Sequence, residues 1–225
     1  GKTSMALKGA LSAAGESGKP VAFCSLEMSK APLVTRLVAS EGRVGSQRLI
    51  AGNLRESDWQ RIAEAASALS CMDIRIDDNP LLTVADMNAK CRRLEHLGLV
   101  VIDYLQLMTA AAPGKSGDNR VTVVSDISRA LKIMAKELNV PVICLSQLSR
   151  ANESRTDKRP MLSDLRESGA IEQDADSVMF LYREDYYEPE TANKNITEVI
   201  VAKHRNGPVD TVKLFFQKAY TRFDN

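Results

Sequence analysis

The sequence predicts an α/β fold in which a mostly parallel, twisted sheet is flanked by helices and followed by an antiparallel hairpin. Short runs rich in Val and Ile, such as residues 99–102, lack the alternation of a half-exposed strand, which is typical of strands buried on both faces of a parallel sheet. Segments with a helical spacing of apolar residues separate these runs. Near the end of the chain, Asn206, Gly207 and Pro208 predict a turn that joins two strands into a hairpin.

The individual elements follow from periodicity, caps and helix-breaking residues. The first helix is expected to end near Gly15 and Gly18, because Pro20 follows and glycine interrupts helices. Thr83 is expected to cap a helix that extends to about His96. Helices are predicted at residues 5–14, 29–39, 55–69, 83–96 and 123–138, strands at 21–25, 74–77, 99–103, 141–145, 177–182, 197–202 and 209–216, and a surface loop at 110–119.

Length and composition favour one globular domain. The 225 residues suffice for one large core, and 44% of them are hydrophobic. No apolar run reaches the roughly 18 residues that span a bilayer, and the first residues do not form a signal peptide, so we expect a cytoplasmic protein without a membrane partner. The net charge of +1 does not indicate a nucleic-acid partner, so binding of a polyanion would require a few placed residues or a ring of subunits.

The cysteines and histidines do not indicate a metal site. The four cysteines show no Cys-x-x-Cys spacing, and Cys24 and Cys144 lie in apolar runs. Buried free thiols are therefore expected rather than disulfides or a zinc site. His96 and His204 are far apart in the sequence, which argues against a metal cluster.

Gly1, Lys2 and Thr3 match the last half of the phosphate-binding loop G-x-x-x-x-G-K-[ST], which opens a helix. In that motif glycine lets the backbone approach the phosphates, the lysine reaches the β- and γ-oxygens, and the hydroxyl ligates Mg²⁺. The alternative is an ordinary chain start that enters a helix. Because the first glycine of the motif and the strand before it are absent, we expect a fragment of a longer protein that binds nucleotide weakly by itself.

Polar side chains follow three of the predicted strands, at the edge where open α/β sheets place functional groups. Asp103 ends a buried strand and is suited to holding Mg²⁺ with a nucleotide; alternatively, it caps the next turn. Glu27 can orient and deprotonate an attacking water, or it is a solvated loop residue. Gln147 can sense a γ-phosphate, or it is structural.

Cationic residues in later segments are candidates for phosphate contacts. Arg166 and Gly169 lie in a polar run that can cradle a phosphate of a nucleic-acid strand, and Arg120, beside the loop at 110–119, can face the same strand. Lys203 and Arg205 lie at the hairpin tip and can act on the γ-phosphate of a neighbouring subunit. In each case the alternative is a solvated basic surface.

Six motifs follow one another along the chain: Gly-Lys-Thr, Ser-Leu-Glu-Met, Ile-Asp-Tyr-Leu-Gln-Leu, Ser-Gln-Leu-Ser-Arg, Asp-Leu-Arg-Glu-Ser-Gly-x-Ile-Glu-Gln-Asp-Ala-Asp and Lys-x-Arg-Asn-Gly-Pro. Their order resembles the C-terminal motor domain of the bacterial and phage replicative DNA helicases, the DnaB family. The resemblance covers essentially all 225 residues. It implies one RecA-like ATPase domain over residues 1–225, without the N-terminal strand, the start of the phosphate loop, the linker helix and the collar domain.

The resemblance also implies a role for each candidate residue. At the nucleotide, Gly1, Lys2 and Thr3 are assigned to phosphate and Mg²⁺ binding, Asp103 to the Mg²⁺ site, Glu27 to the catalytic base and Arg36 to contact with the nucleotide base. Lys203 and Arg205 are assigned to action on the adjacent subunit's site, and Gln147 to coupling between nucleotide and DNA. Contact with single-stranded DNA is assigned to Arg166, Glu167 and Gly169.

The implied function is that of an ATP-hydrolysing motor, which translocates on single-stranded DNA and unwinds duplex DNA as a ring, usually of six subunits. ATP and Mg²⁺ are the implied cofactors, and a helicase loader and primase are implied partners of the full-length protein. One alternative is another RecA-like ring ATPase, of recombinase or clock type. The other is a non-catalytic domain that binds DNA or a partner, against which the intact Lys2, Glu27, Asp103 and Arg205 argue.

Overall fold

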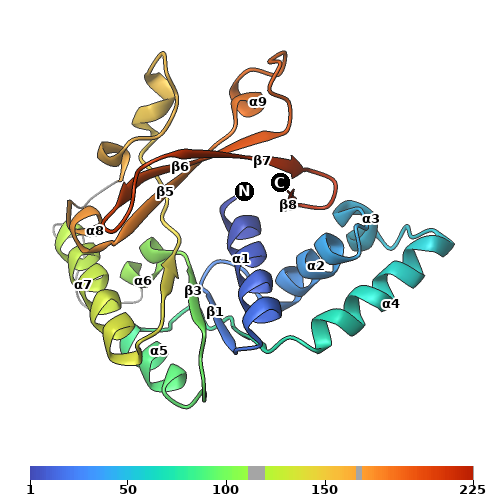
Figure 1. The fold of residues 1–225 in the computed structure, drawn as a ribbon, viewed down its shortest axis with the longest axis horizontal. Coiled ribbons are helices and arrows are strands. Elements are labelled where there is room, and N and C mark those ends of the chain that lie inside the picture. The colour runs from blue at the N-terminus through green and yellow to red at the C-terminus, as the bar shows by residue number, and fades with distance from the viewer. Residues whose placement is uncertain (111–119, 166–168, 225) are drawn as a thin grey trace.

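The computed structural model describes residues 1–110, 120–165 and 169–224. Within them, helices cover both faces of a four-stranded parallel sheet of order β2-β1-β3-β4, and a four-stranded antiparallel sheet of order β5-β6-β7-β8 lies above this block (Figure 1). The strands are β1 (Val21–Ser25), β2 (Ile74–Asp77), β3 (Leu99–Asp103), β4 (Val142–Cys144), β5 (Ser177–Tyr182), β6 (Ile196–His204), β7 (Thr211–Gln217) and β8 (Arg222–Asp224). The helices are α1 (Lys2–Ser17), α2 (Lys30–Glu41), α3 (Ser46–Ala51), α4 (Glu56–Ser70), α5 (Val84–Cys91), α6 (Leu105–Ala110), α7 (Arg120–Leu138), α8 (Gly169–Asp174) and α9 (Glu184–Tyr187), with short 3₁₀ helices at Arg150–Ser154 and Leu162–Asp164.

β1 and β3 are buried along their whole length, as their unbroken apolar sequences predict. Successive side chains of a strand point to opposite faces of the sheet. Phe23 and Val101 therefore pack into one core with α1 and α2, whereas Cys24 and Ile102 pack into a second core with α5 and α7. The parallel sheet is the middle of three layers, which confirms the predicted fold class.

The helix after Thr83 is shorter than its apolar spacing predicts. Thr83 caps α5 as expected: its hydroxyl accepts a hydrogen bond from the Asp86 N–H. The helix ends at Cys91 rather than near His96, because the following N–H groups form tighter turns and His96 has a φ of 56°. The sequence analysis also did not predict four short helices: α3, α6, α8 and α9.

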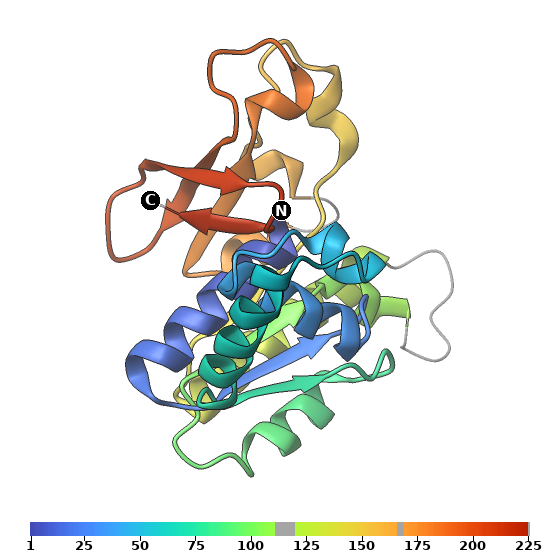
Figure 2. The same ribbon diagram turned by 90° about the vertical axis from the view of Figure 1, so that its right-hand side faces the viewer.

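The predicted hairpin is the centre of a larger antiparallel sheet. β6 pairs with β7, and β5 and β8 add the outer strands. On its inner face the rings of Phe216 and Phe223 are 4.6 Å apart between centroids. β8 lies over the N-terminus of α1, where a Cβ on Gly1 would be 3.4 Å from the Phe223 ring (Figure 2). The antiparallel sheet is thereby fixed above the predicted phosphate site.

All four cysteines are free thiols. Burial raises the pKa of Cys24 to about 12, and Cys91 is buried as well. Cys71, in contrast, is exposed at the end of α4. Among the described residues, none of the helices combines the length and the apolar content needed to cross a bilayer.

We expect Ile102→Ala to lower the free energy of unfolding by about 2–5 kcal/mol, because Ile102 is fully buried in the middle layer and the change leaves a cavity. Ile133→Ala is the matched control: Ile133 is 49% exposed on α7, and we expect a change within about 0.5 kcal/mol. Urea denaturation of both variants measures the difference. Equal losses in the two variants would contradict the three-layer packing.

Candidate functional site

Segments that follow three strands of the parallel sheet leave it side by side. β1 and β3 pair in register, so that Ser25 lies opposite Asp103, and the Leu26 N–H donates to the Asp103 carbonyl oxygen at 2.7 Å. β4 pairs with the other edge of β3. Asp103 ends β3, whereas Glu27 and Gln147 follow the ends of β1 and β4; because the three strands are parallel, all three residues lie at the same edge of the sheet.

The start of α1 is joined to the end of β3 by one short hydrogen bond. The Thr3 hydroxyl donates to Oδ2 of Asp103 at 2.7 Å. Asp103 is only 1% exposed, so its carboxylate requires hydrogen bonds or a cation as partners. Hydroxyl and carboxylate oxygens are ligands that suit Mg²⁺. The pair therefore fits the Mg²⁺ of a bound nucleotide.

Lys2 lies at the same rim. Its ammonium donates to the Ser146 carbonyl oxygen at 3.3 Å and is 5.8 Å from the centroid of the Tyr104 ring. Burial lowers the pKa of Lys2, whereas the nearby charges of Asp103 and Glu27 act to raise it. Lys2, Glu27 and Asp103 are thus close enough to interact electrostatically. Phosphate oxygens at this rim would add the negative charge that compensates the cost of burying the ammonium.

The N-terminus of α1 is suited to an anion. Its N-cap is Gly1, which offers no side-chain cap, and its first turn holds no acidic residue. The first N–H groups of a helix have no partner within the helix, and the helix dipole places partial positive charge there. Together with Lys2, Thr3 and Asp103, this end of α1 fits a nucleoside triphosphate with Mg²⁺.

Gln147 follows β4 and is supported by a residue that the sequence patterns did not single out. Its backbone N–H donates to Oε1 of Gln106 at 3.1 Å, and Nε2 of Gln106 donates to the Ser146 hydroxyl at 2.8 Å. The Gln106 side chain is buried, so α6 fixes the loop that follows β4. A polar residue inside the apolar run at residues 105–108 is the signal that would have identified it.

Two arginines from distant parts of the chain lie near the start of α1. Arg36 on α2, the predicted base contact, is half-buried, and Arg183 directly follows β5. The charges of both arginines and of Lys2 act on the start of α1, so the three side chains lie near this helix end. The Arg183 guanidinium lies 4.7 Å from the Phe216 ring centroid and pairs with Asp185 at 2.8 Å. Arg183 was not among the predicted site residues.

Lys203 and Arg205 lie at and beyond the end of β6 and contact α8 rather than the phosphate rim. Lys203 donates to the Glu172 carbonyl oxygen, and Arg205 donates to the Gln173 carbonyl oxygen. Among the described residues, neither cation forms a hydrogen bond or an ion pair with the rim residues Lys2, Glu27 and Asp103. The structure does not bring these two groups together within one chain.

The predicted DNA contacts are only partly within the described residues. Arg166 and Glu167 lie outside them. Gly169 begins α8, and a Cβ at this position would meet no described atom within 4 Å. Arg120 begins α7, immediately after the predicted loop at 110–119, most of which also lies outside the described residues.

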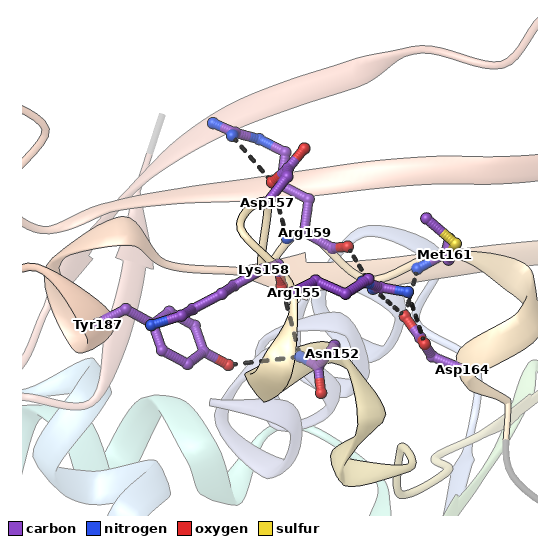
Figure 3. A network of polar contacts seen from close by, with 8 residues as sticks. All are labelled: Asn152, Arg155, Asp157, Lys158, Arg159, Met161, Asp164 and Tyr187. Atoms are coloured by element: carbon purple, nitrogen blue, oxygen red, sulfur yellow. Dashed lines mark hydrogen bonds and ion pairs between the residues drawn. The ribbon is translucent and has the colours of Figure 1, made fainter.

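The two ends of the segment between Gln147 and residue 166 lie side by side. Leu148 and Leu165 form an antiparallel bridge. Arg155 donates to both carboxylate oxygens of Asp164, at 3.0 and 2.6 Å, and Asp164 also accepts the Met161 N–H at 2.9 Å (Figure 3). Asp164 is 1% exposed, so the carboxylate of this ion pair is buried at the centre of the segment.

The same segment is fastened to the antiparallel sheet. Arg159 donates to both carboxylate oxygens of Glu198 on β6, each at 2.8 Å, and lies 4.8 Å from the centroid of the Tyr182 ring. Asn152 lies 3.5 Å from the Tyr187 hydroxyl (Figure 3). The loop between β4 and residue 166 therefore has a defined position on β5, β6 and α9.

The sequence model of one protein family, described as the DnaB-like helicase C terminal domain, matches residues 1–225. The chain belongs to this family. The Bacillus subtilis (strain 168) protein named Replicative DNA helicase DnaC is 54% identical to this DnaB-like domain over 228 residues, which include 100% of the chain. That match covers 50% of the Bacillus protein, so the chain spans about half the length of the curated relatives it matches.

Solved structures agree with this assignment. One solved ATPase domain has 46% sequence identity and a TM-score of 0.93, and the alignment covers 100% of this chain and 80% of that one. A DnaB-like replicative helicase, solved to show its interactions with primase, has 46% identity and a TM-score of 0.92 over 99% of this chain and 54% of that one. The DnaB-like domain therefore has the expected RecA-like fold, and its family is that of the replicative helicases rather than the recombinases or clock-type ATPases.

We expect Arg155→Met to lower the free energy of unfolding of the segment at residues 150–165 by about 3–5 kcal/mol, because it leaves the buried Asp164 carboxylate without its cation. Hydrogen exchange of these backbone amides measures the effect. Arg92→Met is the control, since Arg92 pairs with Glu137 in an exposed ion pair, and we expect unchanged exchange throughout. Equal protection of residues 150–165 in both variants would contradict the role of the Arg155–Asp164 pair.

Proposed function

We propose that this DnaB-like domain is the motor of a replicative DNA helicase that hydrolyses ATP, moves along single-stranded DNA as a ring and unwinds duplex DNA. The observation that supports this most directly is the 2.7 Å hydrogen bond from Thr3 to Asp103, with Lys2 and Glu27 at the same rim. In the proposed site, one triphosphate would be surrounded by a helix N-terminus, a cation, two oxygen groups that suit Mg²⁺ and a carboxylate. Phosphoryl transfer depends on this kind of positioning and charge neutralisation.

Each rim residue has one proposed task. Gly1 and the first N–H groups of α1 bind phosphate oxygens together with Lys2, while Thr3 and Asp103 hold Mg²⁺. When bound, Mg²⁺ neutralises charge on the β- and γ-phosphate oxygens. Glu27 is exposed, which allows it to orient an attacking water and to accept its proton. Arg36 is proposed to contact the nucleotide base.

Lys203 and Arg205 are proposed to complete the nucleotide site of the adjacent subunit. Their contacts with α8, away from the rim of their own chain, support this role. A cation supplied by a neighbour is worth roughly 10³–10⁵ in the rate of phosphoryl transfer. Hydrolysis would then depend on assembly into a ring, which we propose has six subunits.

Single-stranded DNA is the proposed substrate track. Arg166, Glu167, Gly169 and Arg120 are proposed to contact its phosphate backbone, so binding should be independent of sequence and weaken as salt concentration rises. Gln147 is proposed to couple the nucleotide to the DNA. The bridge between Leu148 and Leu165 supports this coupling, because it joins the residue after Gln147 to the residue before Arg166.

The proposed partners of the full-length protein are primase and a helicase loader, at the replication fork in the cytoplasm. The similarity to a helicase solved to show its interactions with primase supports the first of these. The high identity to a named replicative DNA helicase supports the place in replication.

Strand displacement tests the proposed function. We expect the full-length protein to release the labelled strand of a forked duplex when ATP and Mg²⁺ are present, because hydrolysis drives translocation. Lys2→Ala is the control, and we expect it to release no strand, because it removes the cation that binds the phosphates. ATP hydrolysis without strand release would favour a recombinase- or clock-type ring ATPase, and DNA binding without hydrolysis would favour the non-catalytic alternative.

We expect Arg205→Ala to lower the turnover number for ATP by roughly 10³-fold or more, because it removes the cation supplied to the neighbouring site. Binding of a fluorescent ADP analogue should remain within about twofold of the wild type, because each chain keeps its own rim. Lys213→Ala, which removes an exposed cation from β7, is the matched control and should retain normal turnover. Normal turnover in Arg205→Ala would refute the proposed role in trans.

A further inference from the structure

The two cations proposed to act on the neighbouring subunit, Lys203 and Arg205, both contact the short helix α8. The Lys203 ammonium donates to the carbonyl oxygen of Glu172, and the Arg205 guanidinium donates to that of Gln173. Both carbonyls lie near the C-terminal end of α8, which ends at Asp174. The last carbonyl groups of a helix lack partners within the helix and carry partial negative charge, so they attract cations.

Asp176, two residues beyond α8, holds Arg205 at two further points. Its carbonyl oxygen accepts the Arg205 backbone N–H at 2.9 Å, and its Oδ1 lies 3.7 Å from Nη1 of Arg205. The second carboxylate oxygen, Oδ2, accepts a hydrogen bond from Lys132 on α7. This hydrogen bond is the main reason that the pKa of Asp176 lies below its usual value, and the positive charges of Lys132, Arg205 and Lys203 add smaller effects in the same direction.

These contacts orient the Arg205 guanidinium and use only some of its N–H donors. A guanidinium has five N–H donors, and the contacts described above involve only Nη1 and Nη2. The Arg205 side chain is 47% exposed and that of Asp176 is 59% exposed. An ion pair so exposed adds little to stability. Its consequence is therefore geometric, because it limits the directions that the guanidinium can take.

We propose that Asp176 is a positioning residue that directs Arg205 toward the phosphate of the neighbouring subunit. The proposal rests on the role of Arg205 in trans. Because Arg205 also contacts α8, its direction depends on the position of Gly169–Asp174, and this helix begins with Gly169, one of the residues proposed to contact DNA. Asp176 and α8 together link the DNA contact of one subunit to the nucleotide of the next.

Three single variants of the full-length protein test the role of Asp176. We expect Asp176→Asn to lower the DNA-stimulated turnover number for ATP about tenfold. The affinity for a fluorescent ADP analogue and the melting temperature should not change, because the rim and the core are intact. Asp176→Glu should recover most of the turnover. Glu190→Gln is the matched control, because it removes a carboxylate that is 96% exposed and lies 4.0 Å from Lys194, outside the proposed nucleotide and DNA contacts, and it should behave as the wild type.

A double variant separates positioning from a purely structural role. If Asp176 acts through Arg205, single-turnover hydrolysis by Arg205→Ala with Asp176→Asn should be as slow as that by Arg205→Ala alone. A further tenfold loss in the double variant would overturn the proposal. Wild-type turnover in Asp176→Asn, with Arg205→Ala inactive, would overturn it while leaving the role of Arg205 intact. Normal turnover in Arg205→Ala would overturn both.

Discussion

The structure depends on a sheet that is buried on both faces. β1 and β3 send alternate side chains into two separate cores, so neither face can carry a charged group without a large desolvation cost. Polar groups are therefore confined to the strand ends, and parallel pairing gathers these ends on one edge. At the centre of this edge, the confinement of polar groups to strand ends results in the hydrogen bond from Thr3 to Asp103. It joins the helix that is suited to phosphates to the strand end that is suited to Mg²⁺.

The antiparallel sheet contributes to two proposed nucleotide sites, one of its own chain and one of the neighbouring subunit. At one end, β8 lies over the start of α1, and Arg183, which follows β5, lies near the same helix end. At the other end, β6 leads to Lys203 and Arg205, which contact α8. The strands between these ends are hydrogen-bonded to one another, and Arg159 fastens the loop after β4 to the same sheet. A shift of the sheet would therefore affect its own rim and the proposed neighbouring rim together.

The parts that the sequence predicts are those governed by local patterns. The apolar runs identify β1 and β3, and the rule that functional groups lie at strand ends points to Glu27 and Asp103. Each of these two rules depends only on residues that are adjacent in the sequence. Gln106, Arg183 and Asp176 were missed because their partners are distant in the chain: Gln106 contacts Ser146, and Arg183 lies on Phe216. Short helices such as α8 lack enough residues for periodicity to appear, and the end of α5 is decided by tight turns that no apolar spacing records.

In the sequence, Arg166 and Glu167, two of the residues proposed to contact DNA, lie between two connections to proposed nucleotide sites. Upstream, the Leu148–Leu165 bridge ties them to Gln147 at the rim of their own chain. Downstream, α8 and Asp176 tie them to Arg205, which is proposed to serve the rim of the next chain. The Arg155–Asp164 pair, whose carboxylate is buried, holds the upstream connection together. In a ring, this chemistry would make the hydrolysis state at one interface depend on the DNA contact of the adjoining subunit.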